Sequence, residues 1–222
     1  HSTAHLLAQA VQRLFPGAQV TIGPVIENGF YYDFAYERQF TVEDLAKIEE
    51  EMLKIVKEAH PVSRSVKSRD EAVAFFRGMG EHYKAEIIES IPVAEDLSLY
   101  SQGEFTDLCR GGHLPATGIV KAVKILNAAG AYWRGDEKNK QLTRVYAISF
   151  PKQKDLTEYL ELLEEAKRRD HRKLGRELGI YAFSEKVGAG LPLWLPKGTA
   201  LRKKLENFLS EAQKKSGYEF VM

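Results

Sequence analysis

Two short motifs, far apart in the chain, hold most of the residues that could carry chemistry. The motif HSTAH, residues 1–5, places two imidazoles one helical turn apart. The motif DLCRGGH, residues 107–113, places the single cysteine four residues before another histidine, with a glycine pair between them. Three of the six histidines and the one thiol therefore lie in these two motifs. We expect the rest of the chain to be a scaffold that brings them together.

The apolar pattern predicts helices and short strands without a regular β-α alternation. Apolar residues recur with a helical period over 4–15 and 45–59, and a short helix is expected over 83–88. Thr41 with Asp44, and Ser68 with Glu71, are typical of N-terminal capping boxes. Strand-like runs lie at 18–22, 30–34, 62–66, 97–101, 105–108, 119–126 and 142–150. This mixture favours an α+β fold with a mainly antiparallel sheet packed on helices.

The character of the sequence changes near Pro151. We predict a first domain over 1–150 and a highly charged linker helix over 151–178, in which 152–176 is continuous. Its basic run, 167–176, either contacts RNA phosphates or forms a solvated face, and we favour the solvated face. A strand is expected at 191–195, followed by a last helix. That helix should bury the apolar residues Leu201, Leu205, Phe208, Leu209 and Ala212.

The composition of the chain limits the kind of protein that it can be. The chain has 44% hydrophobic and 28% charged residues, a net charge of +1 and one cysteine, which is typical of a globular protein from a reducing compartment. No apolar run approaches the roughly 18 residues that cross a membrane, so we expect no membrane partner. Both ends are abrupt, and the chain opens on His rather than Met. We therefore expect a piece of a longer protein, with 179–222 disordered or in non-native contacts.

The residue types of the two motifs allow more than one kind of site. Two histidines together with the cysteine and histidine of the second motif match a zinc ligand set in type and number. An isolated His-x-x-x-His is more often an ordinary surface or core feature, and a single cysteine is more often a small buried hydrophobe. Asp107 should point to the same strand face as Cys109, because side chains alternate along a strand.

Several longer motifs resemble the editing domain of threonyl-tRNA synthetases. They are HSTAHLL at 1–7, IGPVIENGFYYD at 22–33, DLCRGGH at 107–113, GAYWRGD at 130–136 and RDHRKLG at 169–175. The resemblance runs in the same order over essentially all 222 residues. It implies that 1–150 is the editing domain, that 151–178 is the linker helix and that 179–222 is the truncated start of the class II catalytic domain. The later signature motifs, the catalytic-domain zinc ligands and the anticodon-binding domain are not in the sequence.

The resemblance also implies a reaction. A pocket that accepts threonine admits serine, and one missing methyl group is worth only about 1–3 kcal/mol of discrimination. A second site that fits serine and rejects the extra methyl corrects this error by hydrolysis. The implied substrate and partner is tRNA(Thr) that carries serine at its 3′ end, and the ester to the terminal adenosine is the bond that breaks.

The positions that match the editing domain of threonyl-tRNA synthetases imply a set of site residues. The implied catalytic residues are His1, His5, Lys84, Asp107, Cys109 and His113. We expect His1 and Lys84 to hold or activate the water, Asp107 to bind the amino group or side chain of serine, and the others to shape the pocket and its proton network. The implied substrate-binding residues are Gly23, Tyr32, Arg110 and Arg134, and Tyr32 is expected to contact the adenosine or the amino acid.

The resemblance also has implications for cofactors, and two alternative functions stay open. The resemblance implies that editing needs no cofactor, although the related alanyl-type domains use a similar set for zinc, here His1, His5, Cys109 and His113. ATP, magnesium and a further zinc belong to the catalytic domain of the parent enzyme. That enzyme is expected to be a cytoplasmic homodimer, joined through its catalytic domain, that ligates threonine to tRNA(Thr). Two alternatives are a free-standing trans-editing protein, against which the segment after 151 argues, and a zinc-stapled RNA-binding module without catalysis.

Overall fold

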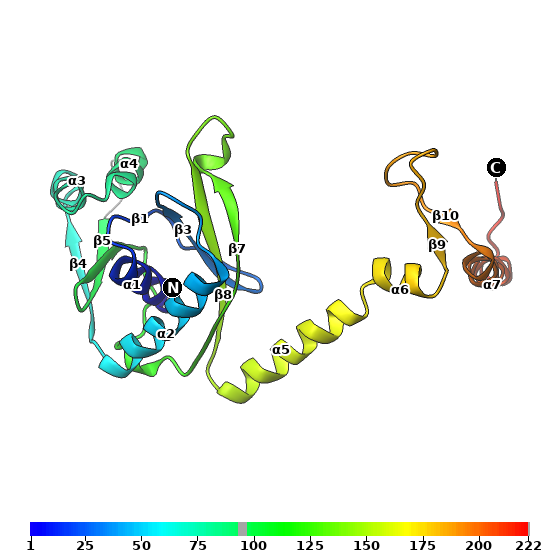
Figure 1. The fold of residues 1–222 in the computed structure, drawn as a ribbon, viewed down its shortest axis with the longest axis horizontal. Helices are drawn as coiled ribbons and strands as arrows, with labels where there is room; N and C mark the ends of the chain where they lie inside the picture. The colour runs from blue at the N-terminus through cyan, green and yellow to red at the C-terminus, as the bar shows by residue number, and fades with distance from the viewer. Residues whose placement is uncertain (93–96, 222) are drawn as a thin grey trace. The chain divides into compact units, whose positions relative to one another are not determined.

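The computed structural model describes residues 1–92 and 97–221, and the chain forms two compact units, His1–Thr157 and Glu158–Met222 (Figure 1). The helices of the first unit are α1 (Ser2–Leu14), α2 (Val42–Glu58), α3 (Arg69–Gly78) and α4 (His82–Ser90), with short 3-10 turns at Thr117–Ile119 and Trp133–Gly135. Its strands are β1 (Gln19–Val20), β2 (Val25–Ile26), β3 (Gly29–Ala35), β4 (Val62–Lys67), β5 (Leu97–Gln102), β6 (Phe105–Leu108), β7 (Ala122–Tyr132) and β8 (Gln141–Phe150).

The strands of this unit form two antiparallel sheets, which confirms the predicted α+β class. One sheet has the order β1-β3-β8-β7, with β2 paired to β3, and the other has the order β4-β5-β6. Every strand pair in both sheets is antiparallel. Both predicted capping boxes are confirmed at the starts of α2 and α3. A turn at Asn28 joins β2 to β3, and Gly29 has a φ of +116° there.

Helix α1 is the centre of the core, between the two sheets (Figure 1). Residues 2–11 are all buried, because the helix carries small and apolar side chains almost all the way round. Its apolar side chains form one cluster with β3, α2 and Phe105 of β6. His1 and His5 are therefore fixed at the start of a rigid, buried element, and His5 faces the ring of Phe105 at 5.7 Å.

The linker region differs from the single helix expected over 152–176. It forms α5 (Gln153–Arg168) and α6 (His171–Glu177), and Asp170 separates them. The Asp170 carboxylate accepts hydrogen bonds from the amides of Arg172 and Lys173, so it acts as the N-cap of a new helix. The basic side chains of this segment lie close to acidic neighbours, as in the Lys167–Glu164 and Arg169–Glu165 pairs, which agrees with a solvated face.

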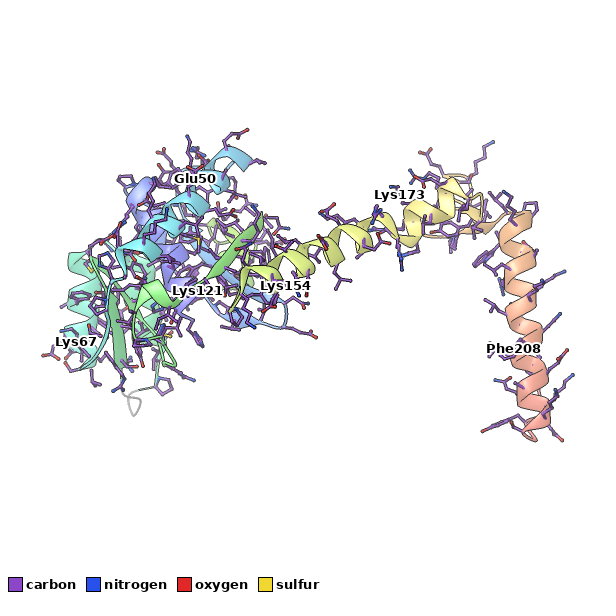
Figure 2. The ribbon with its side chains drawn as sticks, turned by 90° about the horizontal axis from the view of Figure 1, so that it is seen from below. Glu50, Lys67, Lys121, Lys154, Lys173 and Phe208 are labelled. Carbon is purple, nitrogen blue, oxygen red and sulfur yellow. The ribbon has the colours of Figure 1, made fainter. Side chains whose placement is uncertain are left out.

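The rest of the second unit consists of β9 (Tyr181–Ala182), β10 (Leu193–Trp194) and α7 (Pro196–Lys215). Helix α7 is regular, in contrast to the expected disorder. The prediction that it buries its apolar face is wrong, since Leu201, Leu205, Phe208 and Leu209 are 52–69% exposed (Figure 2). More than half of the surface of each of these side chains therefore stays open to solvent. No helix in the described ranges has both the length and the apolar character that a membrane span requires.

Candidate active site

The carboxylate of Asp107 is the centre of the candidate site. Burial alternates along β6, so Phe105 and Asp107 both point into the unit, and Asp107 is only 2% exposed. Its Oδ2 accepts a hydrogen bond from the Tyr32 hydroxyl at 2.6 Å and lies 3.2 Å from His5 Nε2. Its Oδ1 lies 2.5 Å from Lys84 Nζ and accepts from the Leu108 amide at 2.8 Å. Side chains from α1, β3 and α4 therefore meet at one buried carboxylate on β6.

The charge states in this cluster follow from burial and from the ion pair. Burial alone would raise the pKa of Asp107, but the Lys84 ammonium and the His5 ring hold it below the ordinary value. Burial raises the pKa of Tyr32 well above its ordinary value, and the negative charge of Asp107 adds to this effect. Asp107 is therefore a carboxylate and Tyr32 a neutral phenol that donates to it.

His5 is held as a neutral imidazole. Burial lowers its pKa to about 3, although the Asp107 charge acts in the opposite direction. Because Nε2 faces the Asp107 carboxylate, it carries the ring proton, and Nδ1 is left as an acceptor. That Nδ1 atom is buried and has no hydrogen-bond partner among the described residues.

His113 is a second neutral imidazole beside the first. Its ring lies 4.4 Å from the His5 ring and 4.2 Å from the Tyr100 ring, measured between centroids. Its Nδ1 lies 3.2 Å from the hydroxyl oxygen of Ser2, which accepts from the Leu114 amide at 2.8 Å. Burial lowers the pKa of His113 to about 4, and its Nε2 has no partner within the described ranges.

Cys109 and His1 lie toward the open side of the cluster. The Cys109 thiol is half-buried, and its Sγ is 3.7 Å from Nδ1 of the exposed His1. The Cys109 backbone is fixed by β5, because its amide donates to the Ser98 carbonyl at 3.1 Å. Gly111 has a φ of +115°, and a β-carbon there would lie 2.4 Å from the Tyr100 hydroxyl. Only glycine lets the chain turn this closely past Tyr100 toward His113.

Three of these side chains could together hold a metal ion. The ligand atoms of His5, Cys109 and His113 lie within 4.8 Å of one another. Two imidazoles and a thiolate suit zinc, and the two buried nitrogens without partners fit such a role. His1 is not a member of this group. A zinc ion held there would supply a water of lowered pKa.

The predicted substrate-binding residues fall into two groups. Tyr32 is fully buried and donates to Asp107, so it offers no surface to a base, and Gly23 leaves room for its ring, since a β-carbon there would lie 2.2 Å from it. In this structure the Tyr32 hydroxyl is bonded to Asp107, and contact of Tyr32 with the substrate stays a prediction. Arg110 is exposed directly after Cys109. Arg134 contacts Glu86 at 3.0 Å and lies over the Trp133 ring, and it is not a member of the Asp107 cluster.

Two residues of the site, Ser2 and Tyr100, were not predicted from the sequence. Ser2 stands inside the first motif, where the only available signal was its place between the two histidines. Tyr100 follows from the strand pattern only when the pairing of β5 with β6 is known, because Tyr100 lies opposite Asp107. Both residues position His113.

The segment that contains much of the candidate site matches a known protein family. Residues 97–146, which contain β5, β6 and the Asp107–His113 segment, match the family described as the second additional domain of threonyl and alanyl tRNA synthetases. The whole chain is also similar to threonine–tRNA ligases. It is 58% identical over 221 residues to those of Nitratidesulfovibrio vulgaris and Teredinibacter turnerae, and 59% identical over 225 residues to that of Flavobacterium johnsoniae. Each match covers 100% of this chain and 34% of the relative.

The resemblance to threonyl-tRNA synthetases is therefore confirmed over the full chain. The chain spans about a third of the length of these ligases.

Proposed function

We propose that residues 1–150 form the editing domain of a threonyl-tRNA synthetase and hydrolyse the ester of seryl-tRNA(Thr). The observation that carries the proposal is the buried Asp107 carboxylate, which orders Tyr32, Lys84 and His5 beside two imidazole nitrogens without partners. Buried charges and neutral histidines of lowered pKa cost stability, and they are typical of catalytic sites. The similarity to threonine–tRNA ligases supplies the substrate.

The geometry favours an orienting role for Asp107. Its two oxygens already face four donors, from Tyr32, His5, Lys84 and the Leu108 amide, which fill the usual capacity of a carboxylate. A serine amino group reaches Asp107 only by displacing one of them. We therefore revise the expectation that Asp107 binds serine, and assign it to fixing the Lys84 ammonium and the His5 tautomer.

The attacking water needs acceptors that orient it and a base that takes its proton. His5 and His113, with pKa values of about 3 and 4, are weak bases at neutral pH and act as hydrogen-bonding partners that orient the water. His1, the most exposed imidazole of the cluster, takes the proton from the water and gives it to the ribose oxygen as the ester bond breaks. Lys84 brings a fixed positive charge close to the negative charge that develops on the ester oxygen.

The rest of the ligase cycle belongs to the longer protein that the relatives represent. We propose that this protein joins threonine to tRNA(Thr) with ATP and magnesium, in the cytoplasm and as a homodimer through its catalytic domain. In that setting, the editing site acts as a second sieve. It admits serine and excludes threonine by the single extra methyl group.

The test is release of serine from purified seryl-tRNA(Thr) by this chain, with threonyl-tRNA(Thr) as the discrimination control. We expect His1→Ala, Lys84→Ala and Cys109→Ala to abolish release. His60→Ala, which removes a histidine that pairs with Glu58 outside the Asp107 cluster, should leave the rate unchanged. Wild-type rates in the three site variants would contradict the assignment.

A second candidate function rests on the His5, Cys109 and His113 group. These residues could hold zinc and staple a module that binds the tRNA end without cleaving it. Stoichiometric zinc after purification, together with tRNA binding but no ester release, would favour this module over the hydrolase.

A further inference from the structure

Glu81 is a buried carboxylate that the proposed chemistry does not use. It is 5% exposed and occupies the N-cap position of α4. A polar N-cap side chain usually accepts a hydrogen bond from its own helix, but in the described structure the Glu81 carboxylate makes no such bond. Its Oε2 accepts instead from the Val20 amide of β1 at 2.8 Å, and its Oε1 accepts from Nε2 of Gln12 on α1.

These two bonds connect the elements that carry the site. Gln12 lies seven residues after His5 on α1, and two helical turns place both side chains on the same face. Val20 pairs with Phe34 of β3, two residues from Tyr32. Lys84 lies on α4 one turn after Glu81. One carboxylate thus ties the start of α4 to the helix of His5 and to a strand beside that of Tyr32.

We propose that Glu81 is a positioning residue for the deacylation reaction. It fixes the start of α4 against α1 and β1, and so holds Lys84 Nζ on the Asp107 carboxylate. The catalytic part of this statement rests on the proposed function, whereas the tether itself does not. The Lys84 side chain is only 4% exposed where its Nζ lies 2.5 Å from Asp107, so the packing around it limits how far it can readjust if the backbone of α4 moves.

The charge of Glu81 sets how strong this tether is. Its direct partners, the Gln12 amide and the Val20 amide, are neutral, and the charged groups that face it are Lys84 and Asp107. Burial raises the pKa of Glu81 to about 7, against the effects of the Val20 amide and of Lys84. Protonation turns one oxygen into a donor. The Gln12 amide can rotate to accept that proton, but the two partners then bind an uncharged group and the bonds weaken.

A cavity of about 410 Å³ gives the proton a route to Glu81. Its lining residues are Gln12, Gly17, Ala18, Gln19, Met79, Gly80 and Glu81. None of the others is ionisable. The Glu81 side chain is therefore buried between α1, β1 and α4 and still borders a space that water can enter.

Glu81→Gln and Glu81→Ala separate the charge from the contact. The glutamine can still accept from Val20 and can donate to a rotated Gln12, so it imitates the protonated acid, whereas alanine removes both bonds. Glu89→Gln is the matched control, because Glu89 lies near the other end of α4 and pairs with the exposed Arg77. Single-turnover release of serine from seryl-tRNA(Thr) between pH 6 and 9 gives the rate, and amide hydrogen exchange over 82–88 reports on α4.

We expect Glu81→Ala to lower the single-turnover rate by about 10–100-fold, because a displacement of order 1 Å at a catalytic group has that effect. The KM for the tRNA should stay near the wild-type value, and the amides of α4 should exchange faster. In Glu81→Gln, the rise in rate with pH should be less steep than in the wild type. Glu89→Gln should match the wild type in every measurement.

A rate within twofold of the wild type in Glu81→Ala, or unchanged exchange in α4, would overturn the proposal. If Glu81→Ala does not fold, the pH profile of Glu81→Gln decides, and a profile identical to that of the wild type rejects it. Should the wild type release no serine, the proposed function fails. Hydrogen exchange then still tests the tether, because faster exchange of α4 in Glu81→Ala supports it and unchanged exchange refutes it.

Discussion

Replacement of Asp107 by asparagine tests the centre of the site most directly. The carboxylate is 2% exposed and receives donors on both oxygens, with Lys84 and the Leu108 amide on one and Tyr32 and His5 on the other. An asparagine offers one acceptor oxygen and one NH₂ group. Whichever way the amide is turned, its NH₂ faces two donors, and the buried Lys84 ammonium loses its counter-charge.

The contacts of Asp107 allow the loss of stability and of activity in Asp107→Asn to be estimated. Removing one partner of a buried ion pair costs about 3–5 kcal/mol, because the other charge is left uncompensated. For a unit of this size, 1 kcal/mol corresponds to roughly 2–4 °C in melting temperature, so we expect a decrease of about 6–20 °C. Deacylation should fall by at least about 100-fold, because Lys84, His5 and Tyr32 all lose the carboxylate that orients them.

Thermal melting and serine release from seryl-tRNA(Thr) measure the two effects in the same preparation. Asp44→Asn is the matched control, because Asp44 is also a buried carboxylate with an arginine partner, Arg38, and it caps α2 away from the histidines. It should lower stability by about 1–2 kcal/mol and leave the rate unchanged. The reasoning is refuted if Asp107→Asn melts with the wild type, or if it loses no more activity than the Asp44 variant.

Three further changes test other parts of the structure. Gly23→Ala places a β-carbon 2.2 Å from the Tyr32 ring, so we expect a loss of about 1–3 kcal/mol in urea unfolding and slower deacylation. Asp170→Ala removes the N-cap of α6 and should cost about 0.5–2 kcal/mol, seen as faster hydrogen exchange in α6 with an unchanged rate of deacylation. His5 has a pKa of about 3 when folded against 6.5 ordinarily, so below pH 6.5 the unfolded chain takes up a proton that the native state refuses. The contribution of His5 to stability should therefore fall by about 3 kcal/mol between pH 6.5 and 4.5, measured by urea unfolding as the change, over this range, in the difference between the wild type and His5→Gln.

Local signals in the sequence were sufficient for most of the first unit. The capping boxes at Thr41 and Ser68 and the alternation of 105–108 are properties of neighbouring residues, and the structure has the elements that they predict. The break at Asp170 was missed, because a charged helical pattern continues on both sides and a single capping side chain decides the outcome. The apolar face of α7 was predicted to be buried from periodicity alone, which does not show whether a partner surface exists.

For the site, the two motifs indicated which residues could react but not how they are held. Lys84 has the sequence context of a surface lysine, and only the fold places it on Asp107. The burial of Tyr32 was not predictable for the same reason, since a tyrosine on a strand next to a turn looks accessible until the packing around it is known. Glu81 carried no local signal, because its partners come from α1 and β1 and depend on how three elements pack.

The titrations of His5 and Glu81 have opposite effects on how the stability of this unit depends on pH. The folded-state pKa of Glu81 is raised from 4.5 to about 7, so its contribution to stability is full below pH 4.5 and is lost as the pH rises through 7. The contribution of His5 is full above pH 6.5 and is lost as the pH falls toward 3. Between pH 4.5 and 6.5 the two changes have opposite signs and similar size, about 3 kcal/mol each, so they largely cancel. Above pH 7 the cost of the ionised Glu81 remains uncompensated.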